Sequence, residues 1–281
     1  MQTVQSLAPP SGSYLCREVI GKLQNLRERF HEAWQFAEAV VVMRGAVALQ
    51  KTLSVQGPSE GGVTLTKLMH RLSDDLYESK CFSDSCAVDE EAIAIIRRLY
   101  ENRSGDHREH LATTMLRYGV HLSAMGRSEE ACGADEESIK IFRELYAQNP
   151  KVYSDSLACA LHYYGGHLNS LHQYGNERVA LDEALSLRRH WVKTDATTHY
   201  PGLAKLLDSY AHVLITLGHA KQACEAAKVC IEVHVHLYKH DPDRYHHELI
   251  RTANNHIARL HLVGAIEEAD VIRNEIKSLR L

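Results

Sequence analysis

A repeat of 46 residues constrains this chain more than any other feature of its sequence. The repeat can be read from one apolar position, which is occupied by Val19, Leu65, Leu111, Leu157, Leu203 and Leu249. Repeats of about 20 to 50 residues are typical of stacked arrays, in which each unit covers the apolar face of the next. The sequence therefore predicts one elongated repeat domain.

Each copy begins with the pattern of an amphipathic helix. After Leu111, the apolar residues Met115, Tyr118 and Leu122 follow at spacings of four, three and four, which places all of them on one helical face. The equivalent positions in the other copies are Val19, Leu23, Leu26 and Phe30; Leu65, Met69, Leu72 and Leu76; Leu157, Leu161, Tyr164 and Leu168; Leu203, Leu207, Tyr210 and Leu214; Leu249, Ala253, His256 and Leu260. Six copies of this first helix are expected.

A second helix follows each first helix, because further columns keep the same step. One column holds large aliphatic residues: Val47, Ile93, Ile139, Leu185 and Ile231. Another holds small residues: Ala46, Ala92, Ser138, Ala184 and Cys230. Small side chains let two helices approach closely, so this column is expected to face the partner helix. Gly126, Gly218 and Gly264 fall between the paired helices, where glycine accommodates the left-handed conformation that ends a helix.

The sequence thus predicts an all-α fold of about six antiparallel helical hairpins, with units starting near positions 14, 60, 106, 152, 198 and 244. Pro150 and Pro242 lie at the same phase of the repeat, where proline ends one helix before the next begins. Residues 1–13 show no apolar period and are expected to form a flexible lead-in. The repeat domain is then expected to span 14–281.

Composition and charge argue against several classes of partner. The formal net charge is -4 and the pI is near 6.5, so no basic surface for nucleic acid or for an anionic membrane is expected. The longest apolar run, 39–49, contains Arg44 and is shorter than the roughly 20 residues of a membrane span. The N-terminus lacks a secretion signal, and the seven cysteines form no CxxC pair. A cytoplasmic protein with free thiols is therefore expected.

The repeat resembles the tetratricopeptide repeat (TPR). The residues that follow the order and spacing of that family's motif are Met115, Tyr118, Gly119, Leu122, Gly126 and Ala131. The units at 107–147 and 199–239 match it best. The 46-residue period is similar to the long-period type found in kinesin light chain-like proteins and beside NTPase modules in fungal and bacterial signalling proteins. Trp34 and His172 replace the turn glycine in the first and fourth units.

This resemblance implies a right-handed superhelical solenoid whose concave inner face is lined by the first helices. In that family, peptides or partner domains dock on this face. Gly166 belongs to its inner-face rows, and the residues expected to bind a partner are Lys67, His70, Asp74, His162, Lys205, Asp208, His212, Arg251 and Asn254. The Lys, Asn and Arg set by which some of these domains grip a chaperone's C-terminal carboxylate is incomplete here, so that ligand is disfavoured.

Two groups of residues have both a chemical and a structural interpretation. His107 and His110 share a helical face and are a conceivable metal site, but a solvated turn is the favoured interpretation and no HExxH motif is present. Four cysteines lack the spacing of zinc ligands and are interpreted as packing residues: Cys81, Cys86, Cys224 and Cys230.

Other residues also favour packing over chemistry. Tyr118, Tyr164 and Tyr210 recur at the repeat spacing and are expected to pack in the core with their hydroxyl groups pointing outward. The stretch 57–62, GPSEGG, falls between units and is not followed by the Gly-Lys-Ser/Thr of a phosphate-binding loop. The sequence therefore predicts no metal site, no cofactor and no catalysis.

Three hypotheses follow for the function. The first is a non-catalytic scaffold that binds a protein or peptide along the concave face. The second is a sensor or oligomerising arm of a larger NTPase- or protease-type signalling protein, and the third, a remote one, is a metal-dependent enzyme. The partner and the oligomeric state stay open. Because His256 stands in an apolar column and resists protonation, acidification is expected to loosen the last unit.

Overall fold

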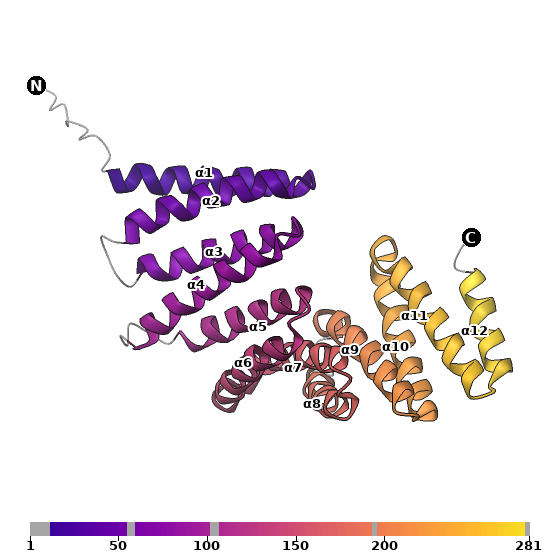
Figure 1. Cartoon of the computed structure of the whole chain (residues 1–281). Helices are drawn as coiled ribbons and strands as arrows, with labels where there is room; N and C mark the ends of the chain where they lie inside the picture. Colours follow the sequence, from indigo (N-terminus) through magenta and orange to yellow (C-terminus); the bar gives the residue numbers. More distant parts are fainter. Residues whose placement is uncertain (1–11, 55–59, 102–106, 193–195, 279–281) are drawn as a thin grey trace, which may run out of the picture. The chain divides into compact units, whose positions relative to one another are not determined.

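The computed structural model describes residues 12–54, 60–101, 107–192 and 196–278, which form twelve α-helices and no strand (Figure 1). The helices are α1 (Gly12–Glu32), α2 (Phe36–Ser54), α3 (Glu60–Glu78), α4 (Phe82–Glu101), α5 (Arg108–Ala124), α6 (Ser128–Gln148), α7 (Pro150–Ser170), α8 (Tyr174–Val192), α9 (Ala196–Thr216), α10 (Ala220–His240), α11 (Pro242–Leu262) and α12 (Ile266–Ser278). The predicted all-α fold is confirmed. Residues 1–11, most of the predicted lead-in, lie outside the described part.

The chain divides into two compact units. Unit 1 runs to Arg127 and contains α1–α5, and unit 2 begins at Ser128 and contains α6–α12. Within each unit, every helix packs against the helices that precede and follow it in that unit, and in unit 2 the first helices α7 and α9 also touch (Figure 1). A helical repeat requires this nearest-neighbour packing, because one hairpin cannot bury its own apolar face.

Each of the six turns between paired helices in the described residues contains one residue in the left-handed conformation. These residues recur every 46 positions: Trp34 (φ 56°), Lys80 (60°), Gly126 (75°), His172 (59°), Gly218 (79°) and Gly264 (76°). The next amide donates back across the turn in every case, as Arg127 N does to Leu122 O at 3.0 Å. The prediction for the three glycines is confirmed, and the other three residues adopt the same turn without glycine.

The prolines at the repeat boundaries begin helices, as the sequence predicted. Pro150 and Pro242 are the first residues of α7 and α11. Proline is tolerated there because the first amides of a helix have no acceptor within it, and its fixed φ suits the first turn. The same proline also ends the preceding helix, so a single residue sets both the end of one helix and the start of the next.

The glycine-rich stretch 57–62 is only partly a linker. Gly61 and Gly62 belong to α3, so the expectation that the whole stretch lies between helices was wrong, and residues 57–59 lie outside the described part. A Cβ atom added at Gly62 would lie 3.0 Å from Leu99 Cδ1. Gly62 is therefore a close-approach residue that lets α3 pack against α4.

Two columns of small residues bring the paired helices together. The predicted column is fully buried at Ala46, Ala92, Ser138, Ala184 and Cys230. Cys230 Sγ lies 3.3 Å from the Ala204 carbonyl oxygen on α9, which shows that this position of α10 faces its partner helix. A second buried column lies seven residues earlier: Ala39, Ser85, Ala131, Glu177, Ala223 and Ala269. Glu177 is the one large member of that second column.

The first column of the first helices is buried in every copy except the first. Leu65, Leu111, Leu157, Leu203 and Leu249 are all buried. Val19 is 43% exposed, so its assignment to the core was wrong, and its neighbour Ile20 is buried instead. The cause is the position of α1, which has no preceding helix among the described residues and packs on one side only.

The tyrosine stripe is half-buried, with its hydroxyl groups bonded to carboxylates on the preceding second helices. The pairs are Tyr118–Glu90 at 2.6 Å, Tyr164–Glu136 at 2.8 Å, and Tyr210–Asp182. Burial and the neighbouring carboxylate raise the pKa of Tyr210 to about 12. The rings pack and the hydroxyl groups point outward, in agreement with the prediction.

The turn geometry predicts that Lys80→Gly stabilises the protein. A side chain in the left-handed region costs about 1–2 kcal/mol, and the extra freedom of glycine in the unfolded chain offsets about half of the gain. We expect the free energy of unfolding, measured by urea denaturation, to rise by up to about 1 kcal/mol. Gly218→Ala is the matched control and should lower it. A Lys80→Gly protein no more stable than the wild type would show that this turn carries no strain.

His256 predicts that the last hairpin is less stable at acidic pH. It is 1% exposed, and neither ring nitrogen has a hydrogen-bond partner among the described residues. Burial lowers its pKa, against an opposing contribution from Glu268, and the charges of Arg259 and Lys228 lower it further. The unfolded chain takes up this proton near pH 6.5 but the folded chain only at lower pH, so stability falls as the pH drops below about 6.5.

We therefore expect less hydrogen-exchange protection in α11 and α12 at about pH 5.5 than at about pH 7.5, after correction for intrinsic exchange rates. His256→Leu should remove the difference, because leucine fills the column without titrating. Equal protection at the two pH values in the wild type would rule the effect out.

Candidate functional site

The predicted binding residues lie on the exposed sides of the first helices, which we call the first-helix face. Unit 1 carries three on α3: Lys67, His70 and Asp74. Unit 2 carries six on α7, α9 and α11: His162, Lys205, Asp208, His212, Arg251 and Asn254. All nine are exposed or half-buried, so each side chain has a surface that a partner can reach.

In unit 1, two of the predicted residues connect α3 with α5. His70 Nε2 lies 2.8 Å from Thr114 Oγ1, and Arg117 pairs with Asp74 and donates to the His70 carbonyl oxygen at 2.8 Å. Burial, together with the charge of Arg117, lowers the pKa of His70 to about 3, so its ring is neutral at pH 7. The exposed Lys67 has no ion pair or hydrogen bond within the described residues, so its charge is available to a partner.

In unit 2, Asp208 connects α9 with α11. Its two oxygens accept from Arg251 Nη1 at 2.8 Å and from Arg259 Nη2 at 3.3 Å. Burial raises the pKa of Asp208, but the hydrogen bonds and charges of the two arginines outweigh burial and lower it overall. His162 Nε2 contacts Ser209 Oγ at 2.9 Å and joins α7 to α9 in the same way. Several predicted binding residues therefore also hold successive first helices together.

A polar hollow of about 330 Å³ opens on the first-helix face of unit 2. Three lining residues belong to the predicted inner-face rows: Gly166, Asp208 and His212. The others were not among the predicted binding residues: Asn169, Glu177, Ser209, Asn255 and Arg259. The lining comes from α7, α8, α9 and α11, so the hollow is built at the junction of successive repeats.

Glu177 is the unusual residue of the polar hollow. It is 3% exposed and accepts a hydrogen bond from Asn169 Nδ2 at 2.8 Å. Burial raises the pKa of its carboxyl group, against smaller opposing effects of that bond and of His212. No cation pairs with it among the described residues. A signal in the sequence could have found it, because all other copies of this column hold alanine or serine.

Comparison with solved structures gives the fold of the chain. BtubC (BKLC) from P. vanneervenii superposes with a TM-score of 0.70 at 16% identity, over 87% of this chain and 91% of that one. The TPR-like repeats of a Podosopora anserina kinesin light chain-like protein give 0.59 at 15% identity, over 82% and 99%. Aspartyl phosphate phosphatase F from Bacillus subtilis gives 0.65 at 11% identity, over 96% and 72%. No family model and no curated protein matches the sequence.

The chain is a TPR-like helical repeat protein. At these identities the comparisons establish the fold alone.

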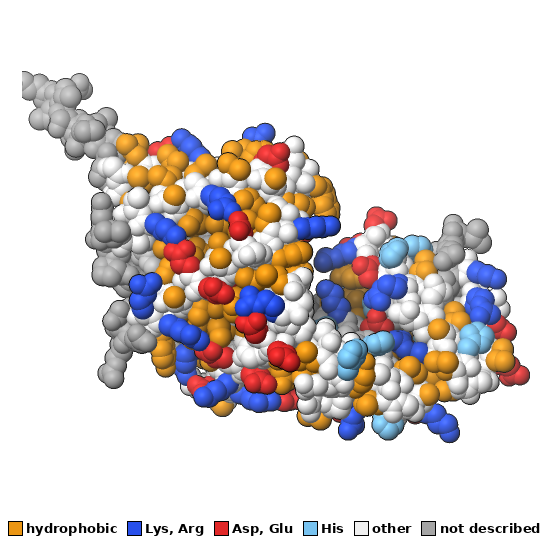
Figure 2. All heavy atoms as spheres, in the orientation of Figure 1, with side chains coloured by type: hydrophobic (Ala, Val, Ile, Leu, Met, Phe, Trp, Pro, Cys, Tyr) orange, Lys and Arg blue, Asp and Glu red, His pale blue; other side chains and the backbone are white. Residues whose placement is uncertain are grey.

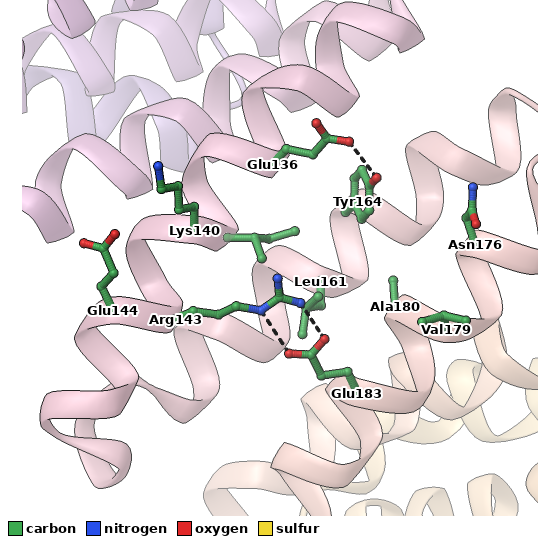
Figure 3. A pocket seen from close by; sticks show the side chains of 11 residues that line it. Glu136, Lys140, Arg143, Glu144, Leu161, Tyr164, Asn176, Val179, Ala180 and Glu183 are labelled. Atoms are coloured by element: carbon green, nitrogen blue, oxygen red, sulfur yellow. Dashed lines mark hydrogen bonds and ion pairs between the residues drawn. The ribbon is translucent and has the colours of Figure 1, made fainter.

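A groove of about 530 Å³ lies in unit 2 of the TPR-like array and is lined by residues of α6, α7 and α8 (Figure 3). Most of its lining comes from the second helices α6 and α8, so we call it the second-helix groove. Leu161 and Tyr164 of α7 lie between α6 and α8, and Arg143 of α6 pairs with Glu183 of α8 at 2.7 Å (Figure 3). Lys140, also at this groove, has no ion pair among the described residues.

The buried polar groups of the TPR-like core do not form a catalytic relay. Asp89 Oδ2 and Ser85 Oγ lie 2.6 and 2.8 Å from His121, and both contact the same ring atom, Nδ1. A relay from hydroxyl to carboxylate needs the two groups on opposite ring nitrogens. All three residues are buried, so the cluster is a structural contact between α4 and α5.

The cysteines divide by burial. Cys86 and Cys230 are buried, as predicted, whereas Cys81 is exposed and its assignment as a packing residue was wrong. It lies directly after the turn residue Lys80, where the chain is at the surface. Burial raises the pKa of the Cys230 thiol to about 12, which keeps it protonated and unreactive.

No three His, Cys, Asp or Glu side chains within the described ranges are placed to share a metal ion. His110 Nε2 instead lies 2.6 Å from Thr66 Oγ1. Burial and the charge of Lys67 lower the pKa of His110 to about 4. The ring is therefore a neutral hydrogen-bonding group between α5 and α3.

The visible surface of each unit carries charges of both signs. Figure 2 shows Lys and Arg side chains interspersed with Asp and Glu on unit 1, and histidines on the visible face of unit 2. Among the helices that the structure describes, none combines the length and apolar character needed to cross a membrane.

The pairing at Asp208 predicts a large difference between two substitutions. Asp208→Asn leaves the mostly buried Arg259 without a counter-charge and should lower the free energy of unfolding by about 2 kcal/mol. Arg251→Gln removes the exposed partner of the same carboxylate and should cost less than about 1 kcal/mol. Urea denaturation of both variants measures the difference. Equal losses of unfolding free energy would mean that the buried Asp208–Arg259 pair and the exposed Asp208–Arg251 pair contribute equally to stability.

Proposed function

We propose that this TPR-like protein is a non-catalytic scaffold that binds an extended peptide or a partner domain along its first-helix face. The observation that carries the proposal is the polar hollow of unit 2, which opens on that face among the predicted rows at Gly166, Asp208 and His212. Ligand sites are concave and contain a few fixed polar groups, and this hollow has both properties.

The exposed groups beside the hollow support an extended partner. Lys205, His212 and Asn254 are exposed, and their side chains make no hydrogen bond or ion pair within the described residues. They lie on two successive first helices, α9 and α11, so a ligand that contacts them all must cross from one repeat to the next. An extended peptide reaches across helices in this way and offers polar groups along its whole length.

The proposal excludes catalysis on physical grounds. The clusters that pair an acid with a base, such as His121 with Asp89 and His167 with Asp135, are buried and hold helices together. The thiols of Cys132 and Cys230 have raised pKa values of about 11 and 12, because both are buried. These groups are structural, and the cytoplasmic setting expected from the sequence suits a protein with such thiols.

Charge reversal on the first-helix face tests the proposal. We expect Lys205→Glu to weaken binding of a captured peptide or protein by about tenfold, because it opposes a group that the partner presents to Lys205. The partner is first captured by proximity labelling and by panning a displayed library of short random peptides. Binding is then measured by fluorescence anisotropy with the purified, full chain.

Lys140→Glu is the matched control, since Lys140 is also exposed and unpaired within the described residues but belongs to the second-helix groove. It should leave the affinity unchanged. If Lys140→Glu weakened binding and Lys205→Glu did not, the partner would occupy the second-helix groove and the proposal would be wrong.

A further inference from the structure

We propose that the polar hollow of unit 2 receives the basic side chain of a peptide, whose ammonium or guanidinium group pairs with Glu177. The inference rests on the proposed function and specifies the chemistry that the partner must bring to one site. It follows from three properties of the hollow: an out-of-place carboxylate, an open space beside it, and the lack of an ion-pair partner for that carboxylate among the described residues.

The carboxylate is out of place in the repeat. Glu177 occupies a buried column in which every other copy has alanine or serine. Burial of a carboxylate without a cation is strongly unfavourable, so this position opposes the stability of its own hairpin. Residues that break the local rules of a fold are expected at functional sites, where binding compensates for the lost stability.

The open space beside Glu177 adjoins Gly166 of α7, whereas the neighbouring Gly165 is a close-contact position. A Cβ atom at Gly165 would lie 2.9 Å from Leu181 Cδ2, so α7 and α8 are in close contact there. A Cβ atom at Gly166, on the side of the hollow, would meet no atom within 4 Å. The equivalent positions of the other copies carry side chains: Glu28, Asp74, Val120, His212 and Ala258. The hollow is thus the place where this row of side chains is interrupted.

The lining of the hollow has one negative charge without a partner. Asp208 pairs with two cations, Arg251 and Arg259, so it is already engaged and this group of three carries one net positive charge. Glu177 has the neutral amide of Asn169 and, further away, the exposed ring of His212. Glu177 is therefore the group at the hollow that lacks an ion pair among the described residues, and a basic side chain placed beside it would form one.

One further group favours a peptide over a free cation. Arg259 is 8% exposed, and its Nη1 atom has no hydrogen-bond partner among the described residues. Buried polar atoms are nearly always hydrogen-bonded, so an acceptor is missing at this site. A carbonyl oxygen next to the basic side chain supplies that acceptor. Lysine or arginine within a peptide offers both groups from one residue.

The test uses peptides selected on the full chain from a displayed library of short random sequences. We expect peptides displaced by Lys205→Glu to share a lysine or arginine at one position. Replacement of that residue by norleucine should weaken binding to the wild type at least about tenfold. The same replacement should have no further effect on the Glu177→Gln protein, because a double-mutant cycle assigns the loss to that one pair.

A stability measurement separates binding from folding. Glu177→Ala restores the residue type of the other repeats and should shift the urea midpoint upward while weakening the basic peptide to the same degree as Glu177→Gln. Glu144→Gln, at an exposed carboxylate on α6, should change neither quantity. A Glu177→Ala protein with a lower midpoint would mean that the glutamate is a structural residue, and would overturn the inference.

The two proposals fail in different ways. Selected peptides that depend on Lys205 but carry no shared basic residue would overturn the present inference and leave the scaffold function standing. A library that yields no peptide dependent on the first-helix face would overturn both.

Discussion

The structure depends on close contact between paired helices at two columns of small residues. Ala46 and its equivalents are fully buried, and Cys230 touches the backbone of the neighbouring helix. This contact holds each hairpin together, and the larger apolar residues on either side then pack against the adjacent hairpins. Helices of this length are marginal alone in water, so the stability of each repeat comes mainly from such contacts.

The sequence predicted the architecture well because the architecture is periodic. Helix pairing, the left-handed turn and the small column all recur at the 46-residue step, so several equivalent positions along the chain support each prediction. Two errors concern the first two units. Val19 is exposed because α1 lacks a preceding helix among the described residues. Gly62 belongs to α3, as the equivalent positions of the later copies belong to their first helices, so the glycine-rich composition was the misleading signal.

The binding site was harder to predict than the fold. Residues on the surface, unlike those of the core, do not have to recur at the repeat spacing for the array to pack. The nine residues that the resemblance predicts to bind a partner are exposed or half-buried, and their role stays a prediction. The resemblance could not show that Asp208 and Asp74 are already engaged by arginines. It also missed Glu177, which comes from a second helix. The hydrogen bonds between first helices hold successive repeats together, so a partner that competes for Asp208 must replace its arginine contacts.

The site proposed at Glu177 would add specificity at one junction of the array without changing the fold of the repeat. The other copies of the repeat act as internal references, since alanine or serine at the same position builds the same hairpin. A substitution at one copy affects only its nearest neighbours, because each repeat contacts only the adjacent ones. The loss of stability is therefore local, while the gain in recognition is open to any ligand on the first-helix face. A buried carboxylate in one hairpin and a missing side chain in its partner helix are sufficient to distinguish this junction from the others.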